Sequence, residues 1–140
     1  MLDSITPPAA QSPLEAPQLV SLALSDGDLC AAVAQYESDA VLQPWAGDVG
    51  GTGDELADRT IRETMTRVTD LRIPLVCRVL SVLPASGLTM LVCERSIDGF
   101  GPDGQRIALR GVGCTVVRLQ ADGAWRIATD VWRLTDEFPI

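Results

Sequence analysis

A change of hydrophobic period after Leu71 is the feature that most constrains the fold of this chain. Before it, apolar residues recur every three or four positions, as on one face of a helix; after it they alternate with a period of two, as in strands. Four strand-like runs follow, joined by short turns, at residues 72–83, 88–98, 105–120 and 124–134. Short connections predict an antiparallel meander. Gly111 and Gly113 interrupt the longest run and predict a bulge or bend that curls the sheet.

The first half of the chain predicts helices and one short strand. Helical spacing starts at Gln18 and again at Leu29, where one face extends to Tyr36, and a third helix runs from Thr52 to about Asp70. That third helix is expected to bury Ala57, Ile61, Met65 and Val68. A strand at residues 40–43 precedes it. The order of elements predicts an α+β fold in which three N-terminal helices pack on the concave face of a curved, largely antiparallel sheet.

The length and composition are those of one domain. The chain has 140 residues, of which 46% are hydrophobic and 21% charged, which suffices for a core without disulfide or metal staples. Residues 1–17 are rich in Pro and Ala and predict a flexible arm. We therefore expect a single folded domain over residues 18–140.

The composition also excludes several kinds of chemistry. The chain has no His and no Lys, and all 11 basic residues are Arg. Nucleophile systems that depend on His, His-ligated metals, Schiff-base lysines and the phosphate-binding lysine of P-loops are thereby removed. The formal charge of −8 disfavours nucleic acid and anionic membrane surfaces as partners, because both attract basic proteins. We expect no cofactor and no metal site.

The cysteines and the first residues of the chain indicate the compartment in which we expect the protein. Cys30, Cys77, Cys93 and Cys114 lie in apolar stretches without metal-binding or redox spacing, so they predict buried free thiols in a reducing environment. The first residues lack the basic and apolar regions of a secretory leader, and no apolar run is long enough for a membrane helix. We expect a cytoplasmic protein with no membrane partner.

Three motifs together resemble a known superfamily. They are Gly-Asp-Leu at residues 27–29, Tyr-Glu-Ser-Asp-Ala-Val at residues 36–41, and Asp-Gly-Ala-Trp-Arg-Ile-Ala-Thr-Asp-Val-Trp at residues 122–132. In this order they resemble the nuclear transport factor 2-like superfamily, in its ketosteroid isomerase-like and SnoaL-like branch of small bacterial proteins, over residues 18–134. The resemblance implies a cone-shaped (cystatin-like) fold, an apolar pocket between sheet and helices, and a homodimer packed through the sheets. It does not imply one activity, since members include isomerases, polyketide cyclases and proteins without known activity.

The catalytic positions of the steroid isomerases in that superfamily are all changed here. The position of the Asp base falls at Pro44 or Gln43, neither of which can take a proton. The Tyr position in the first helix falls near Val20, and the protonated Asp that holds the enolate oxygen falls at Thr115. We therefore do not expect steroid isomerisation by the known mechanism.

The resemblance extends to part of the pocket wall, since Tyr36 and Trp132 match aromatic pocket residues of the superfamily. If Trp132 points inward, alternation along the strands predicts that other residues share its face, and these are Arg126, Ala128, Asp130, Gly113, Thr115, Val117, Leu88, Met90, Val92 and Glu94. Burial raises the pKa of carboxyl groups, so Asp130 and Glu94 are the candidate proton-transfer residues. Alternatively, they lie at the rim or form structural ion pairs with Arg78, Arg95 or Arg110.

Three further aromatic and aliphatic positions are open to two interpretations each. Trp125, Ile127 and Val131 are predicted on the convex face, where they form a dimer interface or pack under the N-terminal arm of the same chain. Trp45 follows the first strand, where it is either a lid over a ligand or a plug against the helices.

Three functions remain open from the sequence. The first is a dimeric protein that binds a small apolar or cyclic molecule among Tyr36, Trp45, Met90, Thr115 and Trp132. The second is an isomerase or polyketide cyclase type of enzyme, in which Asp130 or Glu94 transfers a proton and Thr115 or Arg126 stabilises an enolate-like oxygen. The third is an oligomerisation module without a ligand.

Overall fold

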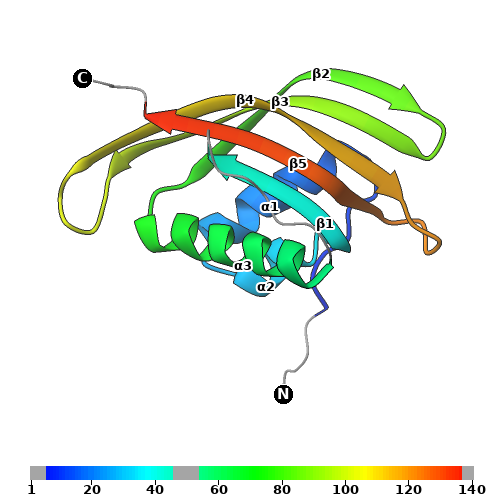
Figure 1. Cartoon of the computed structure of the whole chain (residues 1–140), viewed down its shortest axis with the longest axis horizontal. Coiled ribbons are helices and arrows are strands. Elements are labelled where there is room, and N and C mark those ends of the chain that lie inside the picture. Colours follow the sequence, from blue (N-terminus) through cyan, green and yellow to red (C-terminus); the bar gives the residue numbers. More distant parts are fainter. Residues whose placement is uncertain (1–5, 46–53, 137–140) are drawn as a thin grey trace.

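The chain forms a curved, unclosed sheet with helices on one face (Figure 1). The computed structural model describes residues 6–45 and 54–136. Within them lie α1 (Glu15–Ser25), α2 (Leu29–Val33), β1 (Tyr36–Trp45), α3 (Asp54–Leu71), β2 (Leu75–Ala85), β3 (Leu88–Phe100), β4 (Arg106–Leu119) and β5 (Trp125–Asp136). The α+β class and the position of the helices are confirmed. No helix in the described ranges is long and apolar enough to span a membrane.

The strand order in the sheet is β1-β5-β4-β3-β2. The last four strands in the chain form the predicted antiparallel meander, and β1 adds to it in parallel beside β5. Turn glycines with positive φ make the reversals, such as Gly87 between β2 and β3 and Gly123 between β4 and β5. The sheet is therefore mixed, as expected.

The helical layer closes the core from one side. On α3, the buried residues Ile61, Met65 and Val68 recur at helical spacing and pack against β1, as predicted. Asp28 caps α2, because its side chain accepts a hydrogen bond of 3.1 Å from the backbone N–H of Ala31. The other large members of the core are Val20, Leu42, Leu91, Ile97, Ile127, Trp132 and Leu134.

The second helix is shorter than predicted. It ends at Val33, and Tyr36 opens β1 instead of closing the helix. The backbone of Ile127 donates a hydrogen bond of 2.8 Å to the carbonyl of Gln35, and Tyr36 pairs with Ile127. Pairing with β5 thus overrides the local helical pattern, which is a common effect of tertiary structure.

More of the N-terminal segment packs against the rest of the domain than the sequence predicts. Helix α1 begins at Glu15, upstream of the predicted start at Gln18. Ala10 is fully buried and forms a bridge with Trp125, and the amide of Gln35 donates to the carbonyl of Pro8 at 2.7 Å. Part of the predicted arm therefore belongs to the folded domain.

Gly111 and Gly113 have a role other than the predicted bulge. A Cβ atom at either position would overlap the backbone of β5, at Arg133 and Val131 respectively. The glycines thus permit a close approach of two strands. The shift in register between β4 and β5 falls instead between Val116 and Val117.

Candidate functional site

Asp130 lies at the centre of a buried group of polar side chains under the concave face of the sheet. Its Oδ2 atom accepts hydrogen bonds from the hydroxyl of Tyr36 at 2.7 Å and from the indole N–H of Trp132 at 2.8 Å. Its Oδ1 atom accepts from the hydroxyl of Thr115 at 2.7 Å. These residues come from β1, β4 and β5, and together with Arg95 of β3 we call them the buried polar cluster.

Arg95 supplies the charge that balances Asp130. Its Nη1 atom lies 3.3 Å from Oδ1 of Asp130, and its Nη2 atom donates to Oγ1 of Thr115 at 3.1 Å. The guanidinium group also lies 5.0 Å from the ring centroid of Trp132, within the range of a cation–π contact. The residue is only 1% exposed, and Nη1, although it forms this ion pair with Asp130, makes no hydrogen bond among the described residues.

The cluster changes the pKa values of two of its members, Tyr36 and Arg95. Burial and the carboxylate of Asp130 raise the pKa of Tyr36 well above its ordinary value, so the phenol keeps its proton. Burial alone would lower the pKa of Arg95, but Asp130 and the neighbouring groups together raise it. Arg95 is therefore a permanent cation, and Tyr36 is a permanent hydrogen-bond donor.

Two cysteines border the cluster. The Sγ atom of Cys93 lies 3.8 Å from Oγ1 of Thr115. A hydrogen bond with the Cys77 side chain lowers the pKa of Cys93 to about 7, and the same bond raises the pKa of Cys77 well above its ordinary value. All four cysteines are free, but Cys30 is exposed and Cys77 and Cys114 are half-buried, so the prediction of buried thiols is wrong for Cys30 and incomplete for the latter two.

The predicted inward residues of β3 lie on the wrong face. Thr89, Leu91, Cys93, Arg95 and Ile97 are buried, whereas the predicted Leu88 is exposed and Met90, Val92 and Glu94 are half-buried on the outer face. Leu91 pairs with the inward Thr115, which fixes this register. Glu94 forms an ion pair with Arg78, at 3.2 Å. The geometry therefore supports the interpretation in which Glu94 forms a structural ion pair.

On β5 the alternation is interrupted. Asp130 and Trp132 point inward as predicted, and Ala128 and Val117 are also buried. Ile127 was expected on the convex face and is fully buried, and Arg126 was expected inward and is exposed. The register shift opposite Ala128 reverses the alternation on its N-terminal side.

The remaining predicted residues, Trp125, Val131 and Trp45, lie in different parts of the molecule. Trp125 is half-buried, and its backbone N–H donates to the carbonyl of Ala10 at 2.9 Å, so its backbone pairs with the predicted arm of the same chain. Val131 lies on the outer face of the sheet, where it lines a cavity of about 340 Å³ with Val92, Val112 and Cys114. The backbone of Trp45 pairs with Leu134, but its side chain lies outside those that the structure describes, as does that of Ala57. Only some of the residues predicted for the ligand pocket therefore lie together.

Arg95 is the residue that sequence reasoning did not place in the site. Alternation gives β3 two faces that each carry several apolar residues, and the sequence does not say which one faces the helices. The sequence gives one signal for it: Arg95 is among the arginines that could form a structural ion pair with Asp130, the alternative to a catalytic role for Asp130.

A cavity of about 260 Å³ includes Tyr36, Glu37 and Ser38 of β1 in its lining, and Tyr36 is the one member of the cluster among its lining residues. Val33, Ala34 and Ile61 line it from the helices, and Arg126 lines it from β5. Within the described part of the chain, no group of three or more Cys, Asp or Glu side chains could hold a metal ion. The site thus offers hydrogen-bond donors and apolar walls.

Comparison of the whole chain with solved structures identifies its fold. A ketosteroid isomerase-like protein from Erwinia carotovora atroseptica matches with a TM-score of 0.69 and 16% identity over 90% of this chain and 94% of that chain. An NTF-2-like protein of unknown function from Shewanella oneidensis MR-1 matches with a TM-score of 0.66 and 16% identity over 84% and 93%. A candidate calcium/calmodulin-dependent protein kinase type II association domain from Thiobacillus denitrificans matches with a TM-score of 0.69 and 14% identity over 94% and 99%.

The chain therefore has the nuclear transport factor 2-like, ketosteroid isomerase-like fold. The sequence comparisons add nothing to this result, since no family model and no curated protein matches the chain. At these identities the likeness defines the fold, and the function has to be argued from the site.

Proposed function

We propose that this protein is a homodimer that binds a small apolar or cyclic molecule inside the cone, against the buried polar cluster. The ligand presents a hydrogen-bond acceptor to Arg95 and an apolar body to the walls around Tyr36. Steroid isomerisation by the known mechanism is not part of this function, because Pro44 or Gln43 and Thr115 stand at the positions of its two acidic residues.

The observation that carries the proposal is the Nη1 atom of Arg95. A buried N–H group without an acceptor costs about 1–3 kcal/mol, and more when it is charged. Arg95 is 1% exposed and its Nη1 atom contacts Asp130 only as an ion pair at 3.3 Å, so neither bulk water nor the described residues give this donor a hydrogen bond. A carbonyl, hydroxyl or carboxylate oxygen of a ligand would do so. The cavity whose lining includes Tyr36 supports a ligand on that side of the cluster.

The cluster favours binding over proton transfer. Both carboxylate oxygens of Asp130 already accept hydrogen bonds from Tyr36, Thr115 and Trp132. A general base needs a free oxygen within reach of the substrate proton. Asp130 instead holds the donors in place, and Tyr36 keeps its proton because its pKa is raised. An isomerase or cyclase that uses Asp130 remains the alternative, and it predicts turnover that Asp130→Asn abolishes.

The outer face of the sheet supports the homodimer. Val76, Leu83, Leu88 and Val112 are exposed there, and we call them the outer-face patch. Figure 1 shows no helix on this side of the sheet. The four residues are apolar, so packing against a second copy would remove their exposed surface from water.

Native mass spectrometry of the purified protein, with release of bound molecules, tests the proposal. We expect two chains of 14.9 kDa with one small molecule bound to each. Arg95→Met should lose that molecule, whereas the control Arg78→Met, which changes an exposed arginine of the outer face, should keep it. A circular dichroism spectrum equal to that of the unchanged protein establishes that the Arg95 variant is folded. An empty wild-type protein, or retention of the molecule by folded Arg95→Met, contradicts the proposal.

An oligomerisation module is the second candidate. It is favoured by the exposed outer-face patch together with the likeness to the association domain from Thiobacillus denitrificans. It predicts a stable oligomer without a ligand in the same measurement.

A further inference from the structure

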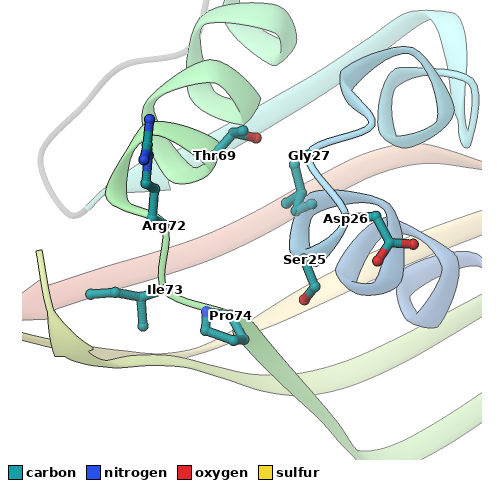
Figure 2. A pocket seen from close by; sticks show the side chains of 8 residues that line it. Ser25, Asp26, Gly27, Thr69, Arg72, Ile73 and Pro74 are labelled. Atoms are coloured by element: carbon teal, nitrogen blue, oxygen red, sulfur yellow. The ribbon is translucent and has the colours of Figure 1, made fainter. Parts of the chain in front are cut away.

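The edge strand β2 begins beside a cavity and carries a half-buried cysteine. This cavity, distinct from the one on the outer face, has a volume of about 340 Å³ and lies between the turn after α1 and the turn that joins α3 to β2 (Figure 2). Ile73 and Pro74 line it, and Figure 2 shows the chain continuing from Pro74 into β2. Cys77 follows on this strand and is half-buried. Molecules of the size of water therefore reach the chain just before the strand that carries Cys77.

Cys77 and Cys93 are neighbours on the inner face of the sheet. In the antiparallel register of β2 and β3, Cys77 lies opposite Arg95 and Cys93 lies opposite Val79, so the two cysteines are diagonal neighbours on one face. Their side chains share a hydrogen bond. The Sγ atom of Cys93 also lies 3.8 Å from Oγ1 of Thr115. Two free thiols and a buried arginine therefore meet in one place.

The surroundings of Cys93 favour its thiolate. The hydrogen bond from Cys77 is the largest cause of the lowered pKa of Cys93, which is about 7. Arg95 and Thr115 also lower this pKa, whereas burial and Asp130 raise it. The same hydrogen bond and burial raise the pKa of Cys77, which keeps its proton. Because the thiolate is the nucleophilic form of cysteine, the pair contains one nucleophile and one thiol beside it.

Arg95 adds a hydrogen-bond donor on the same face. It is 1% exposed, and its Nη1 atom makes no hydrogen bond among the described residues. When a thiolate attacks a peroxide, negative charge develops on the oxygen that departs. A buried guanidinium group stabilises such a charge strongly, because the surrounding dielectric constant is low. The site thus combines a nucleophile, a second thiol and a donor for a departing oxygen.

We propose that Cys93 and Cys77 form a redox pair that reduces hydrogen peroxide. The thiolate of Cys93 attacks one oxygen of the peroxide, so an S–O bond forms and the O–O bond breaks. The departing hydroxide takes up the proton that Cys93 had released and leaves as water. The sulfur of Cys77 then attacks the sulfenic acid, so an S–S bond forms and the S–O bond breaks. The second hydroxide leaves as water with the proton of Cys77. Two thiols are thereby oxidised to one disulfide, and one peroxide is reduced to two molecules of water.

An external dithiol completes the cycle. Diagonal neighbours on two strands lie farther apart than the usual partners of a disulfide, so the new bond strains β2 and β3. Strained disulfides are readily reduced. Exchange with a dithiol restores both thiols and oxidises the dithiol to its own disulfide. This activity does not require the ligand proposed above.

Burial restricts the oxidant to small molecules. Cys93 is 0% exposed, so an oxidant has to pass between packed side chains to reach its sulfur. Hydrogen peroxide is little larger than water, whereas an aromatic hydroperoxide is several times larger. We therefore expect hydrogen peroxide to react faster than cumene hydroperoxide. Equal rates would overturn the assignment of hydrogen peroxide as the preferred oxidant.

A protein with Cys30→Ser and Cys114→Ser keeps only the proposed pair and is used for the test. Its reaction with hydrogen peroxide at pH 7, stopped at intervals and followed by intact mass spectrometry, should be on the order of tenfold faster than that of free cysteine. About half of Cys93 is thiolate at this pH, against a few per cent of a free thiol. The product should lack two hydrogen atoms, and dithiothreitol should restore the original mass. A rate no higher than that of free cysteine, or a product without the disulfide, would overturn the proposal.

Two further changes in the same protein separate the roles of the cysteines. Cys77→Ser keeps a hydrogen-bond donor but cannot form the disulfide, so a sulfenic acid should persist at Cys93 and react with dimedone. Cys93→Ser, shown to be folded by circular dichroism, should lose the fast reaction. An unchanged rate in Cys93→Ser, or a dimedone adduct at Cys77 only, would contradict these roles. Because Cys93→Ser leaves the buried polar cluster in place, it should retain the molecule seen by native mass spectrometry, and each proposal can fail without the other.

Discussion

At the scale of single residues, Asp130 is the position on which the interior depends most. It accepts three short hydrogen bonds and forms the ion pair with Arg95. Asp130→Asn leaves the arginine charge buried without compensation, which typically costs about 3–5 kcal/mol. Urea denaturation should therefore show a large loss in the free energy of unfolding. Asp98→Asn, which breaks the exposed ion pair with Arg106, is the control and should lose less than about 1 kcal/mol. Equal losses would remove Asp130 from this role.

Arg72 is a residue whose backbone conformation can be tested through stability. Arg72→Gly relieves the positive φ angle and should raise the free energy of unfolding by about 1 kcal/mol. Gly27→Ala is the reverse control: it introduces a side chain at a φ of +74°, with no atom within 4 Å, and should destabilise through conformation alone. A destabilised Arg72→Gly would show that the arginine side chain stabilises the turn.

Cys93 provides a prediction about pH. Its thiol is neutral well below a pKa of about 7 and becomes a thiolate above it, because the Cys77 side chain makes a hydrogen bond to it. Cys77→Ala removes that bond, so the midpoint of the ultraviolet thiolate signal should move up toward the ordinary value of 9.0. Cys114→Ala should leave the midpoint in place. A midpoint that stays near 7 in Cys77→Ala would mean that Arg95 and Thr115, rather than Cys77, lower the pKa of Cys93.

At the scale of the elements, the close approach of β4 and β5 can be tested directly. Gly113→Ala places a Cβ atom onto the carbonyl of Val131, and the strands have to separate. We expect a loss of about 3 kcal/mol in thermal or urea denaturation, at the upper end for overpacked sites. The control Gly104→Ala adds a methyl group in open space at a φ of +80° and should lose only about 1 kcal/mol. A loss in Gly113→Ala no larger than in the control would contradict the close approach.

The elements also show how far the sequence predicts this structure. The order of helices and strands follows from the two hydrophobic periods, which are local properties. Which face of β3 points inward is not local, since Leu91 and Cys93 on one face and Met90 and Val92 on the other are similar in hydrophobicity. The position of Ile127 depends on a register shift between β4 and β5, and no residue marks it in the sequence. For these reasons Asp130 and Tyr36 could be placed in the site, whereas Arg95 could not.

At the scale of the whole molecule, the outer-face patch is where the proposed homodimer can be tested. Val112 is 48% exposed near the middle of this face. Val112→Glu places a charge there and should convert the dimer into a monomer of 14.9 kDa in size-exclusion chromatography with light scattering. Leu22→Glu changes a leucine of α1 that is 62% exposed away from the sheet and should leave the dimer intact. A dimer that survives Val112→Glu would have its interface elsewhere.

The parallel pairing of β1 with β5 has a consequence for the order of folding. Tyr36 near one end of the chain pairs with Ile127 near the other, and Asp130 completes the contacts of Tyr36 and Arg95. Closing so long a loop is slow compared with forming a hairpin, so the meander of β2, β3 and β4 can form first. On the ribosome, β1 and the helices emerge long before their partner strand exists. The nascent chain therefore holds Arg95 without its counter-ion until β5 has been synthesised, and the interior closes only after that strand has left the ribosome.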